Sequence, residues 1–346
     1  MARDVHLVGS VPVADAAEVF ERTSAALGKR LKRIPDGETG ARIDWITWLE
    51  PAFRDSGDFE LSDEVFKLHA TAPSYRRYRL KPGRKVDDVR FPNLYYADVA
   101  KASYAVFAKL KAAGKIPAGT RFQVDLVPAH SVLWLFIAEA LQGPVDPLYN
   151  DALGREIDAI PASIPAGELA IQFDVASAVF ARLQRGDYHP YGTTRAEALD
   201  RFVAILAALG NRVPKGVELM YHFCYGDSNH RHVVEPKDMA DMVEVANRLA
   251  GAATRPIDLI HMPVPRDRSD DAYFAPLKGL SLAPATGLSL GLVHHTDGVD
   301  GTKWRLAAAR RVVEKFSVAT ECGFGRRKPE TIPELLRIHA EIADLD

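Results

Sequence analysis

The sequence predicts an α/β protein folded as a (β/α)8 TIM barrel, with all 346 residues in a single domain. Three observations support this prediction. Short β-rich runs alternate with longer helical patterns, which is typical of βαβ units with parallel pairing. The runs 169–173 and 217–221 are apolar, or nearly so, on both faces, as a sheet covered on both sides requires. About eight such units occur, and this number favours a closed barrel over an open sheet.

The predicted elements follow one another in a regular order. Strands are expected at residues 5–8, 30–34, 122–127, 169–173, 217–222, 257–261, 288–293 and 317–320. Helices are expected at residues 14–27, 44–53, 95–113, 131–141, 147–160, 195–209, 236–249, 302–314 and 332–342, and another begins at Ala176. Pro236 suits the first position of its helix, because a backbone N–H at that position has no partner within the helix.

A long insertion is expected after the second strand, at about residues 41–120. It contains the predicted helices at 44–53 and 95–113. Residues 57–90 between them are polar and irregular, and we expect them to form a surface excursion rather than a linker. The chain has no internal repeat or low-complexity tract, so the prediction remains one domain over residues 1–346.

The composition excludes several classes of function. Hydrophobic residues make up 47 % and charged residues 26 %, and the formal net charge is −2. Without a strongly basic surface, nucleic acid is not an expected partner. The N-terminal residues lack an apolar stretch behind a basic start, and no run reaches the length of a membrane span. We expect a cytoplasmic protein that acts on small-molecule substrates, with a homodimer as one option for its assembly.

Reactive side chains follow nearly every predicted strand. In chain order they are Ser10, Asp36, Glu38, His130, Ser131, Asp174, His222, Cys224, His261, His294, His295, Glu321 and Cys322. The carboxyl ends of all strands in a parallel barrel lie on one face, where barrel enzymes carry out their chemistry. Polar residues are common in loops, but histidine and cysteine are rare types and recur here at matching points. We therefore expect these side chains to share one site.

The rarest of these residues have the spacing of a metal site. His222 and Cys224 are two residues apart at the end of a predicted strand, so their side chains point the same way. Cys322 ends the last strand, and His261 ends the strand between. Zinc prefers thiolate and imidazole ligands in a tetrahedron. These residues therefore predict a site of two histidines and two cysteines, or of one histidine and both cysteines with an exchangeable fourth position. The alternative is a buried apolar thiol and a histidine that only donates hydrogen bonds.

Two further groups are candidates for binding and catalysis. Asp36 and Glu38 lie in a glycine-containing turn, where they could bind an amino or hydroxyl group of a substrate or simply form the turn. One histidine of the pair His294-His295 could act as a general acid or base, oriented by Asp297 or Asp300. The alternative is a turn that caps the next helix.

Several basic residues near the strand ends could bind an anionic group. Arg266 or Arg268 could bind a carboxylate in bidentate fashion, or could form surface salt bridges. The segment 323–327, beyond Cys322, could close over an anionic group, or could be a turn into the last helix. The polar loop with Asp227 and His230-Arg231-His232 is expected to be solvated.

Together these segments resemble the C-terminal catalytic barrel of the cobalamin-independent methionine synthase family, from about Val5 to the C-terminus. Val8-Gly9-Ser10 looks like the family's opening strand, and Pro35-Asp36-Gly37-Glu38 looks like its Asp-Gly-Glu turn. Ile171-Gln172-Phe173-Asp174 is similar to the strand that meets the amino-acid substrate. His222-x-Cys224 matches the zinc pair, and Ala319-Thr320-Glu321-Cys322-Gly323 resembles the segment with the other zinc cysteine. His295 falls where the family has a histidine that assists proton transfer.

The resemblance implies a zinc-dependent methyl or alkyl transferase in which a substrate thiol binds the cofactor Zn²⁺ as a thiolate. The implied zinc ligands are His222, Cys224, His261 and Cys322. The implied substrate-binding residues are Ser10, Asp36, Glu38, Asp174 and Arg266, and the implied catalytic residues are His295 and Asp297.

Departures from the family pattern leave the substrate unassigned. His261 stands where the family has a zinc-binding glutamate, which makes the site one charge more positive. Val175 and Ala176 follow Asp174, where the family has a second glutamate. The N-terminal half of the full-length synthase has no counterpart, so we expect a stand-alone, core-only relative.

Two other functions are consistent with the sequence. The same barrel and metal could support a lyase, hydrolase or demethylase that acts on a non-thiol small molecule. Alternatively, the barrel could be non-catalytic and bind a small molecule, with cysteines that are only structural.

Overall fold

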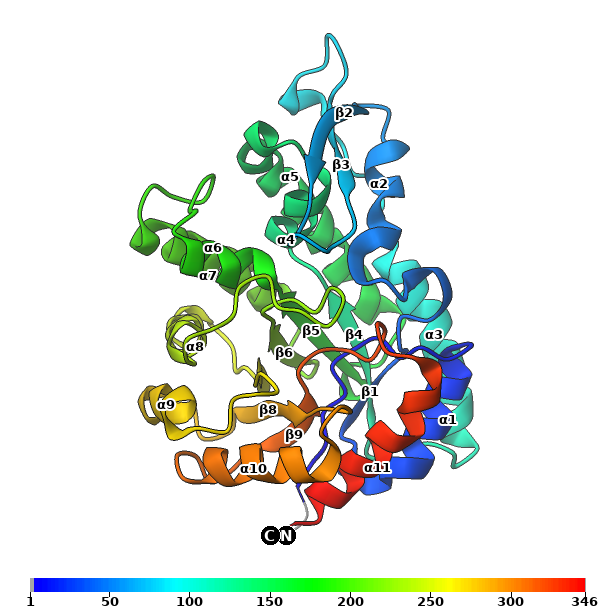
Figure 1. Cartoon of the computed structure of the whole chain (residues 1–346). Helices are drawn as coiled ribbons and strands as arrows, with labels where there is room; N and C mark the ends of the chain where they lie inside the picture. Colours follow the sequence, from blue (N-terminus) through cyan, green and yellow to red (C-terminus); the bar gives the residue numbers. More distant parts are fainter. Residues whose placement is uncertain (1–2, 346) are drawn as a thin grey trace.

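The chain is built around a curled parallel sheet of seven strands with helices packed outside it. The structure is a computed structural model that describes residues 3–345. The strand order is β1-β4-β5-β6-β7-β8-β9 (Figure 1). The strands are β1 (Arg33–Pro35), β4 (Arg121–Leu126), β5 (Leu169–Val175), β6 (Glu218–Phe223), β7 (Leu259–Pro263), β8 (Gly287–Val293) and β9 (Ser317–Thr320). Seven of the predicted strands are thus confirmed, within one to three residues at their ends.

The register of the sheet brings the reactive residues to one edge. All six strand pairings are parallel, so the carboxyl ends of the strands lie together. Asp174 on β5 is paired with His222 on β6, and His222 is paired with His261 on β7. Three candidate site residues are therefore side by side in neighbouring strands.

The prediction of a first strand at residues 5–8 is wrong. Only Val5 pairs, through isolated parallel bridges to Leu31 and Val318. The next carbonyls accept hydrogen bonds from side chains instead of a neighbouring strand: Gln123 donates to Leu7 at 3.1 Å and Gln172 donates to Val8 at 2.7 Å. The predicted closed sheet of eight strands is therefore a curled sheet of seven strands, with the N-terminal segment bridging its two edges.

The helices of the barrel lie outside the sheet (Figure 1). They are α1 (Ala16–Leu27), α3 (Tyr96–Ala112), α4 (Ala129–Phe136), α5 (Glu139–Ala159), α6 (Ser177–Arg185), α7 (Arg195–Arg212), α8 (Ala240–Ala252), α10 (Gly298–Arg310) and α11 (Ile332–Ala343). Two further helices are short, α2 (Pro51–Arg54) and α9 (Asp271–Phe274). Within residues 3–345 no helix is long and apolar enough to cross a membrane.

Several predicted helix starts are wrong: α5 begins at Glu139 rather than Pro147, and α10 begins at Gly298 rather than Thr302. Two others are wrong for local reasons. Helix α8 begins at Ala240 rather than Pro236, because Asp238 accepts a hydrogen bond from the backbone N–H of Ala240 at 2.8 Å and fixes the start there. Residues 45–49 form a 3₁₀ turn, and the α-helix follows only at α2.

The insertion after β1 contains an antiparallel hairpin where an irregular excursion was expected. Strands β2 (Phe59–Phe66) and β3 (Tyr75–Leu80) pair with each other and project beyond the sheet, beside α2 and α4 (Figure 1). Buried and exposed positions do not alternate regularly along either strand, and the register shifts between Leu61 and Val65, so the sequence shows no period of two. The hairpin is anchored by a hydrogen bond from Ala138 N–H to Tyr78 O at 2.9 Å, in the break between α4 and α5.

Candidate metal centre and adjoining pockets

His222, Cys224 and Cys322 come together at the carboxyl edge of the sheet. One ligand atom from each lies within 4.8 Å of the others, and the two Sγ atoms are 3.8 Å apart. Strand β6 supplies His222, and Cys224 follows it, held in extended form by a hydrogen bond from its N–H to Val175 O at 3.1 Å. The predicted convergence of the two cysteines is therefore present in the fold.

A glycine in the loop after β9 lets Cys322 reach this position. Phe324 N–H donates to Ser10 O at 2.6 Å, and Gly325 N–H donates to Ser10 Oγ at 3.2 Å. A Cβ atom on Gly323 would lie 2.8 Å from the backbone N of Ser10, which is closer than any side chain can approach. Ser10 thus holds the loop that carries the second thiol, and it also lines the pocket.

The two hydrogen bonds of His261 determine which nitrogen of His222 carries the proton. Nε2 of His261 lies 3.0 Å from the carbonyl oxygen of Thr320, so it must carry the proton and donate. Nδ1 of the neutral His261 ring is then an acceptor, and Nδ1 of His222, 2.7 Å away, must be the donor. Burial lowers the pKa of both histidines, which keeps them neutral. The unprotonated atom of His222 is therefore Nε2.

His261 itself lies outside the cluster of three ligand atoms. Both of its ring nitrogens are used, one by Thr320 and one by His222. A histidine that fixes the tautomer and orientation of a metal-binding histidine is a common arrangement behind metal sites. In this geometry His261 orients His222.

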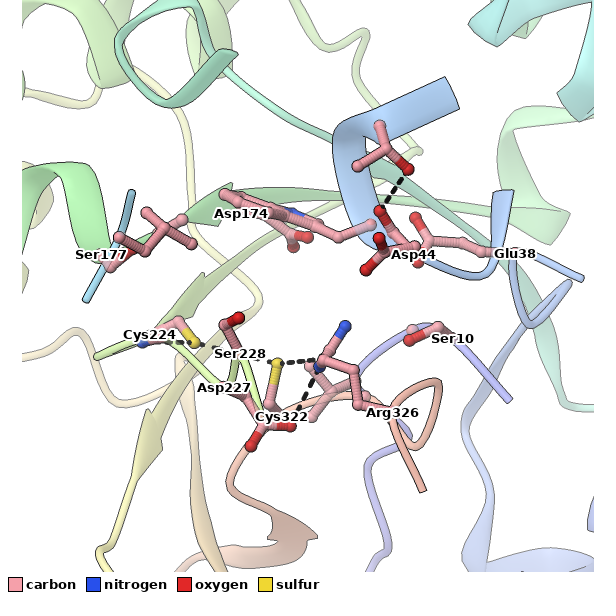
Figure 2. Close-up of a pocket in the computed structure, with 18 of the residues that line it drawn as sticks. Ser10, Glu38, Asp44, Asp174, Ser177, Cys224, Asp227, Ser228, Cys322 and Arg326 are labelled. Carbon is pink, nitrogen blue, oxygen red and sulfur yellow. Dashed lines mark hydrogen bonds and ion pairs between the residues drawn. The ribbon is translucent and has the colours of Figure 1, made fainter. Parts of the chain in front are cut away.

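The two thiols differ in their affinity for a proton. The hydrogen bond from Cys224 lowers the pKa of Cys322, and the neighbouring Arg326 lowers it further. The same bond, together with burial, raises the pKa of Cys224 well above its usual range. Nη2 of Arg326 is 3.1 Å from Cys322 Sγ, and its Nε is 3.2 Å from Asp227 (Figure 2). Two sulfur donors and one imidazole nitrogen fit the ligand preferences of zinc, with one tetrahedral position left for a substrate.

A cavity of about 70 Å³ opens beside the three ligand residues. Figure 2 shows Cys224 and Cys322 on one side of it, with Asp174, Asp44 and Glu38 on the other. The insertion contributes part of its wall, through Asp44, Trp45, Thr47, Leu68 and Tyr75. The excursion expected at the surface therefore covers the candidate site.

The carboxylates of Glu38 and Asp174 line this cavity, and that of Asp125 lies in a smaller adjoining pocket that Glu38 also lines. Burial, then the charges of Asp174 and Asp36, raise the pKa of Glu38 to about 8. Burial, then the thiolate of Cys322, raise the pKa of Asp174 to about 8. Burial also raises the pKa of Asp125 well above its usual range. Within residues 3–345 none of these three carboxylates forms a salt bridge. They can therefore bind a cationic substrate group or be protonated.

The sequence analysis missed Asp125, although a signal for it exists. Gln172 donates to Asp174 at 3.0 Å, and Gln123 donates to Asp125 at 2.9 Å in the same way on the neighbouring strand. Both pairs have the pattern Gln-x-Asp near the end of a strand. Asp36, by contrast, was selected, but its carboxylate already accepts hydrogen bonds from Arg42 and Ser103, both at 2.7 Å.

A second, larger cleft of about 800 Å³ adjoins the first at Asp227, which lines both. His294 and His295 lie in it, as does Arg266. His294 is buried, donates from Nε2 to Val264 O at 2.8 Å, and has its Nδ1 3.8 Å from Glu321. His295 is only half-buried, so both members of the predicted histidine pair reach the cleft.

Asp297 has another partner. Arg305 donates to both oxygens of its carboxylate, at 2.6 and 2.8 Å, and lowers its pKa. Asp297 lines neither of the two pockets. Its contacts hold the start of α10, and its predicted role of orienting His295 stays a prediction.

The fold is similar to solved structures of methionine synthases. The sequence itself matches no protein-family model and no curated protein. A B12-independent methionine synthase from Shewanella sp. W3-18-1, solved with selenomethionine, has a TM-score of 0.61 at 15 % identity over 99 % of this chain and 98 % of its own. A candidate vitamin-B12-independent methionine synthase from Listeria monocytogenes has a TM-score of 0.57 at 14 % identity over the same shares. A methyltransferase from Methanosarcina mazei has a TM-score of 0.55 at 11 % identity, over 98 % and 94 %. At this level of identity the similarity establishes the fold, which is the one that the sequence resemblance implied.

Proposed function

We propose that the protein is a zinc-dependent transferase that moves a methyl or alkyl group to the sulfur of a small thiol. The observation that carries this proposal is the cluster of His222, Cys224 and Cys322, with ligand atoms within 4.8 Å of one another beside a cavity. Zinc held there would lower the pKa of a substrate thiol, so that the sulfur is a thiolate at neutral pH.

The residues around the metal would hold the ligands in place. His222 would bind through Nε2, because its Nδ1 is the donor to His261. Cys224 and Cys322 would bind as thiolates, and Arg326 beside Cys322 would offset part of their negative charge. The neutral His261, where the resembling family has glutamate, leaves the site with one negative charge fewer.

The carboxylates across the cavity would recognise the thiol substrate. Within residues 3–345 neither Glu38 nor Asp174 forms a salt bridge, so an ammonium group of the substrate would be favoured between them. The solved Shewanella protein holds selenomethionine, an amino acid, which is consistent with a substrate of this class. The pKa of Asp174, about 8, is close to neutral pH. This carboxylate could therefore also accept the thiol proton.

The transfer step uses both pockets. The substrate sulfur forms a bond to the methyl or alkyl carbon, and the bond between that carbon and the donor breaks. The electron pair of the broken bond stays with the leaving group, which then needs a proton. His295 lines the adjoining cleft and is half-buried, so it could supply that proton as a general acid. His294 is a poorer candidate, because burial keeps it neutral and its proton is donated to Val264 O.

Cobalt substitution tests the proposal directly. Zinc content is measured on protein purified without chelator, and Co²⁺ is then exchanged for zinc. We expect about one metal per chain, and a new thiolate-to-cobalt absorption band when small aminothiols are added. Cys322→Ser should lose the metal, whereas Ser289→Ala, a buried change on β8, should keep it. Absence of metal from the purified protein, or a cobalt spectrum that no thiol changes, would remove this mechanism.

A second function has one observation in its favour. Three protein ligands with an open position, facing carboxylates with raised pKa values, would equally suit a zinc-bound water that attacks a non-thiol substrate. A lyase, hydrolase or demethylase of this kind predicts turnover that does not depend on any added thiol, and the cobalt experiment separates the two functions.

A further inference from the structure

The larger cleft holds four basic side chains that have no acidic partner. Arg231, Arg266, Arg327 and Lys328 all line it, and within residues 3–345 none of them forms a salt bridge. Exposed arginines elsewhere in this chain are commonly paired, as Arg248 is with Asp200 and Arg337 is with Glu334. Four unpaired cations in one cleft are therefore a local feature of this site.

The acidic residues of the same cleft are largely neutralised by other groups. Asp227 is paired with Arg326 at 3.2 Å and lies 3.4 Å from His230. Glu321 and Glu235 accept hydrogen bonds from the two nitrogens of His232, at 2.5 and 2.8 Å. Those two carboxylates raise the pKa of His232 to about 9, so this histidine is also a cation at neutral pH. One imidazolium offsets only one of these two carboxylates, so one carboxylate charge and Asp267 remain against the four basic residues, and the cleft keeps an excess of two positive charges.

The four cations come from three different loops at the carboxyl edge of the sheet. Arg231 follows β6, Arg266 follows β7, and Arg327 and Lys328 follow β9. The loop after β8 adds His294 and His295. Arg327 also has a buried Nε that finds no hydrogen-bond acceptor in the described chain. No hydrogen bond from the Arg327 side chain is formed within residues 3–345, so its guanidinium is available to donate to an oxyanion in the cleft.

We propose that this cleft is a second subsite, which binds the oxyanion group of an organic substrate. Its volume of about 800 Å³ is larger than an inorganic ion requires, so the anion is one end of a larger molecule. Asp227 lines both pockets, so a molecule anchored here can extend toward the thiols. If the proposed transferase function holds, this molecule is the methyl or alkyl donor, and its anionic end is a phosphate or a set of carboxylates.

The test measures anion binding to the zinc-loaded protein by isothermal titration calorimetry. Inorganic pyrophosphate represents phosphates and citrate represents clustered carboxylates, both at constant ionic strength set with chloride. We expect saturable binding, stronger for whichever anion matches the natural group. The double variant Arg266→Gln/Arg327→Gln should weaken it by roughly 10- to 100-fold, because two charge-assisted contacts are lost.

Matched variants keep the result interpretable. Arg311→Gln removes an exposed arginine after α10 next to Asp271, outside the cleft, and should bind the anions as the wild type does. Lys328→Gln changes one exposed side chain with little risk to folding, and should weaken binding several-fold by itself. The proposal is overturned if neither anion binds better than chloride, or if the cleft variants and Arg311→Gln bind alike.

The anion subsite and the proposed function can fail separately. Cys322→Ser should lose metal and thiol binding but still bind the better anion, because the cations lie on other residues. Anion binding without any thiol-dependent change in the cobalt spectrum would remove the transferase proposal and keep the subsite. A normal cobalt–thiol band without anion binding would do the reverse.

Discussion

A single buried hydrogen bond determines how His222 can act. Because His261 must donate to the carbonyl of Thr320, it can only accept from His222, and this leaves Nε2 of His222 unprotonated. The tautomer is thus fixed before any ion arrives. His261 fixes this tautomer as a neutral imidazole, and it stands where the resembling family has a zinc-binding glutamate.

Replacing His261 tests whether it orients His222 or binds metal itself. His261→Phe removes the acceptor for Nδ1–H of His222 while filling a similar volume. We expect zinc affinity to fall by about 10- to 100-fold, as for other residues that orient a metal ligand. A competition titration with a chromophoric chelator measures the change.

The outcome is read against two reference variants. His222→Phe removes a ligand, so it should weaken zinc binding much more than His261→Phe does. His130→Phe removes another fully buried histidine, one with no hydrogen-bond partner in the described chain, and should leave zinc affinity unchanged. Equal losses in His261→Phe and His222→Phe would mean that His261 is a fourth ligand after all.

His232 makes the stability of the protein depend on pH. Its bonds to Glu321 and Glu235 raise its pKa to about 9 in the folded chain, against 6.5 for an ordinary histidine. The folded state therefore binds this proton more tightly, so the stabilisation is complete below pH 6.5 and is lost as the pH rises to about 9. The difference corresponds to at most about 3 kcal/mol.

Urea unfolding of the wild type and His232→Gln, from about pH 6 to pH 9.5, checks this expectation. The wild type should lose more stability across this window than the variant does, and the two should converge at the alkaline end. His295→Gln, in the same cleft, shows whether the loss of any nearby histidine has this effect. Parallel profiles for the wild type and His232→Gln would contradict the assignment.

At the scale of single elements, the buried strands could be predicted because their pattern depends on local sequence. β5 and β9 are confirmed because every position, or nearly every one, faces packed side chains, and such runs are apolar without a gap. The residues that follow the strands were predicted for the same reason. Once β6 and β9 are located in the sequence, Cys224 and Cys322 are found just after them.

The errors arise where distant side chains replace local backbone pairing. The segment after Val5 is not a strand because Gln123 and Gln172 occupy its carbonyl groups, and these two residues lie more than a hundred positions away. The hairpin was missed because residues distant in sequence anchor it: Arg77 donates to the carbonyl of Trp134, and Ala138 N–H donates to that of Tyr78. Arg326 was predicted only as part of the segment 323–327 that could close over an anionic group, because nothing in the local sequence indicates that it turns toward Cys322.

At the scale of the whole molecule, the two ends of the described chain lie together. Arg3 N–H donates to Ala343 O at 2.7 Å, and Arg30 pairs with Asp344 at 2.6 Å. Val5 bridges both edges of the sheet close to this point. The site, by contrast, is assembled at the opposite, carboxyl edge of the strands, by loops that follow β6, β7, β8 and β9. The contacts that hold the two chain ends together and the candidate site therefore lie at opposite ends of the strands.

This separation predicts that the chain can be circularly permuted without loss of the metal site. Joining the termini with a short glycine-rich linker and opening the chain between Gly114 and Lys115, both exposed in the turn before β4, breaks no strand and touches neither pocket. We expect one zinc per chain, and one unfolding transition that is the same by circular dichroism and by tryptophan fluorescence.

The matched control opens the chain between the fully buried Leu219 and Met220 of β6, and should not fold, because the strand that carries His222 is cut. Two separate transitions in the first permutant would show that the insertion and the barrel unfold as independent units, and would contradict the prediction of a single domain.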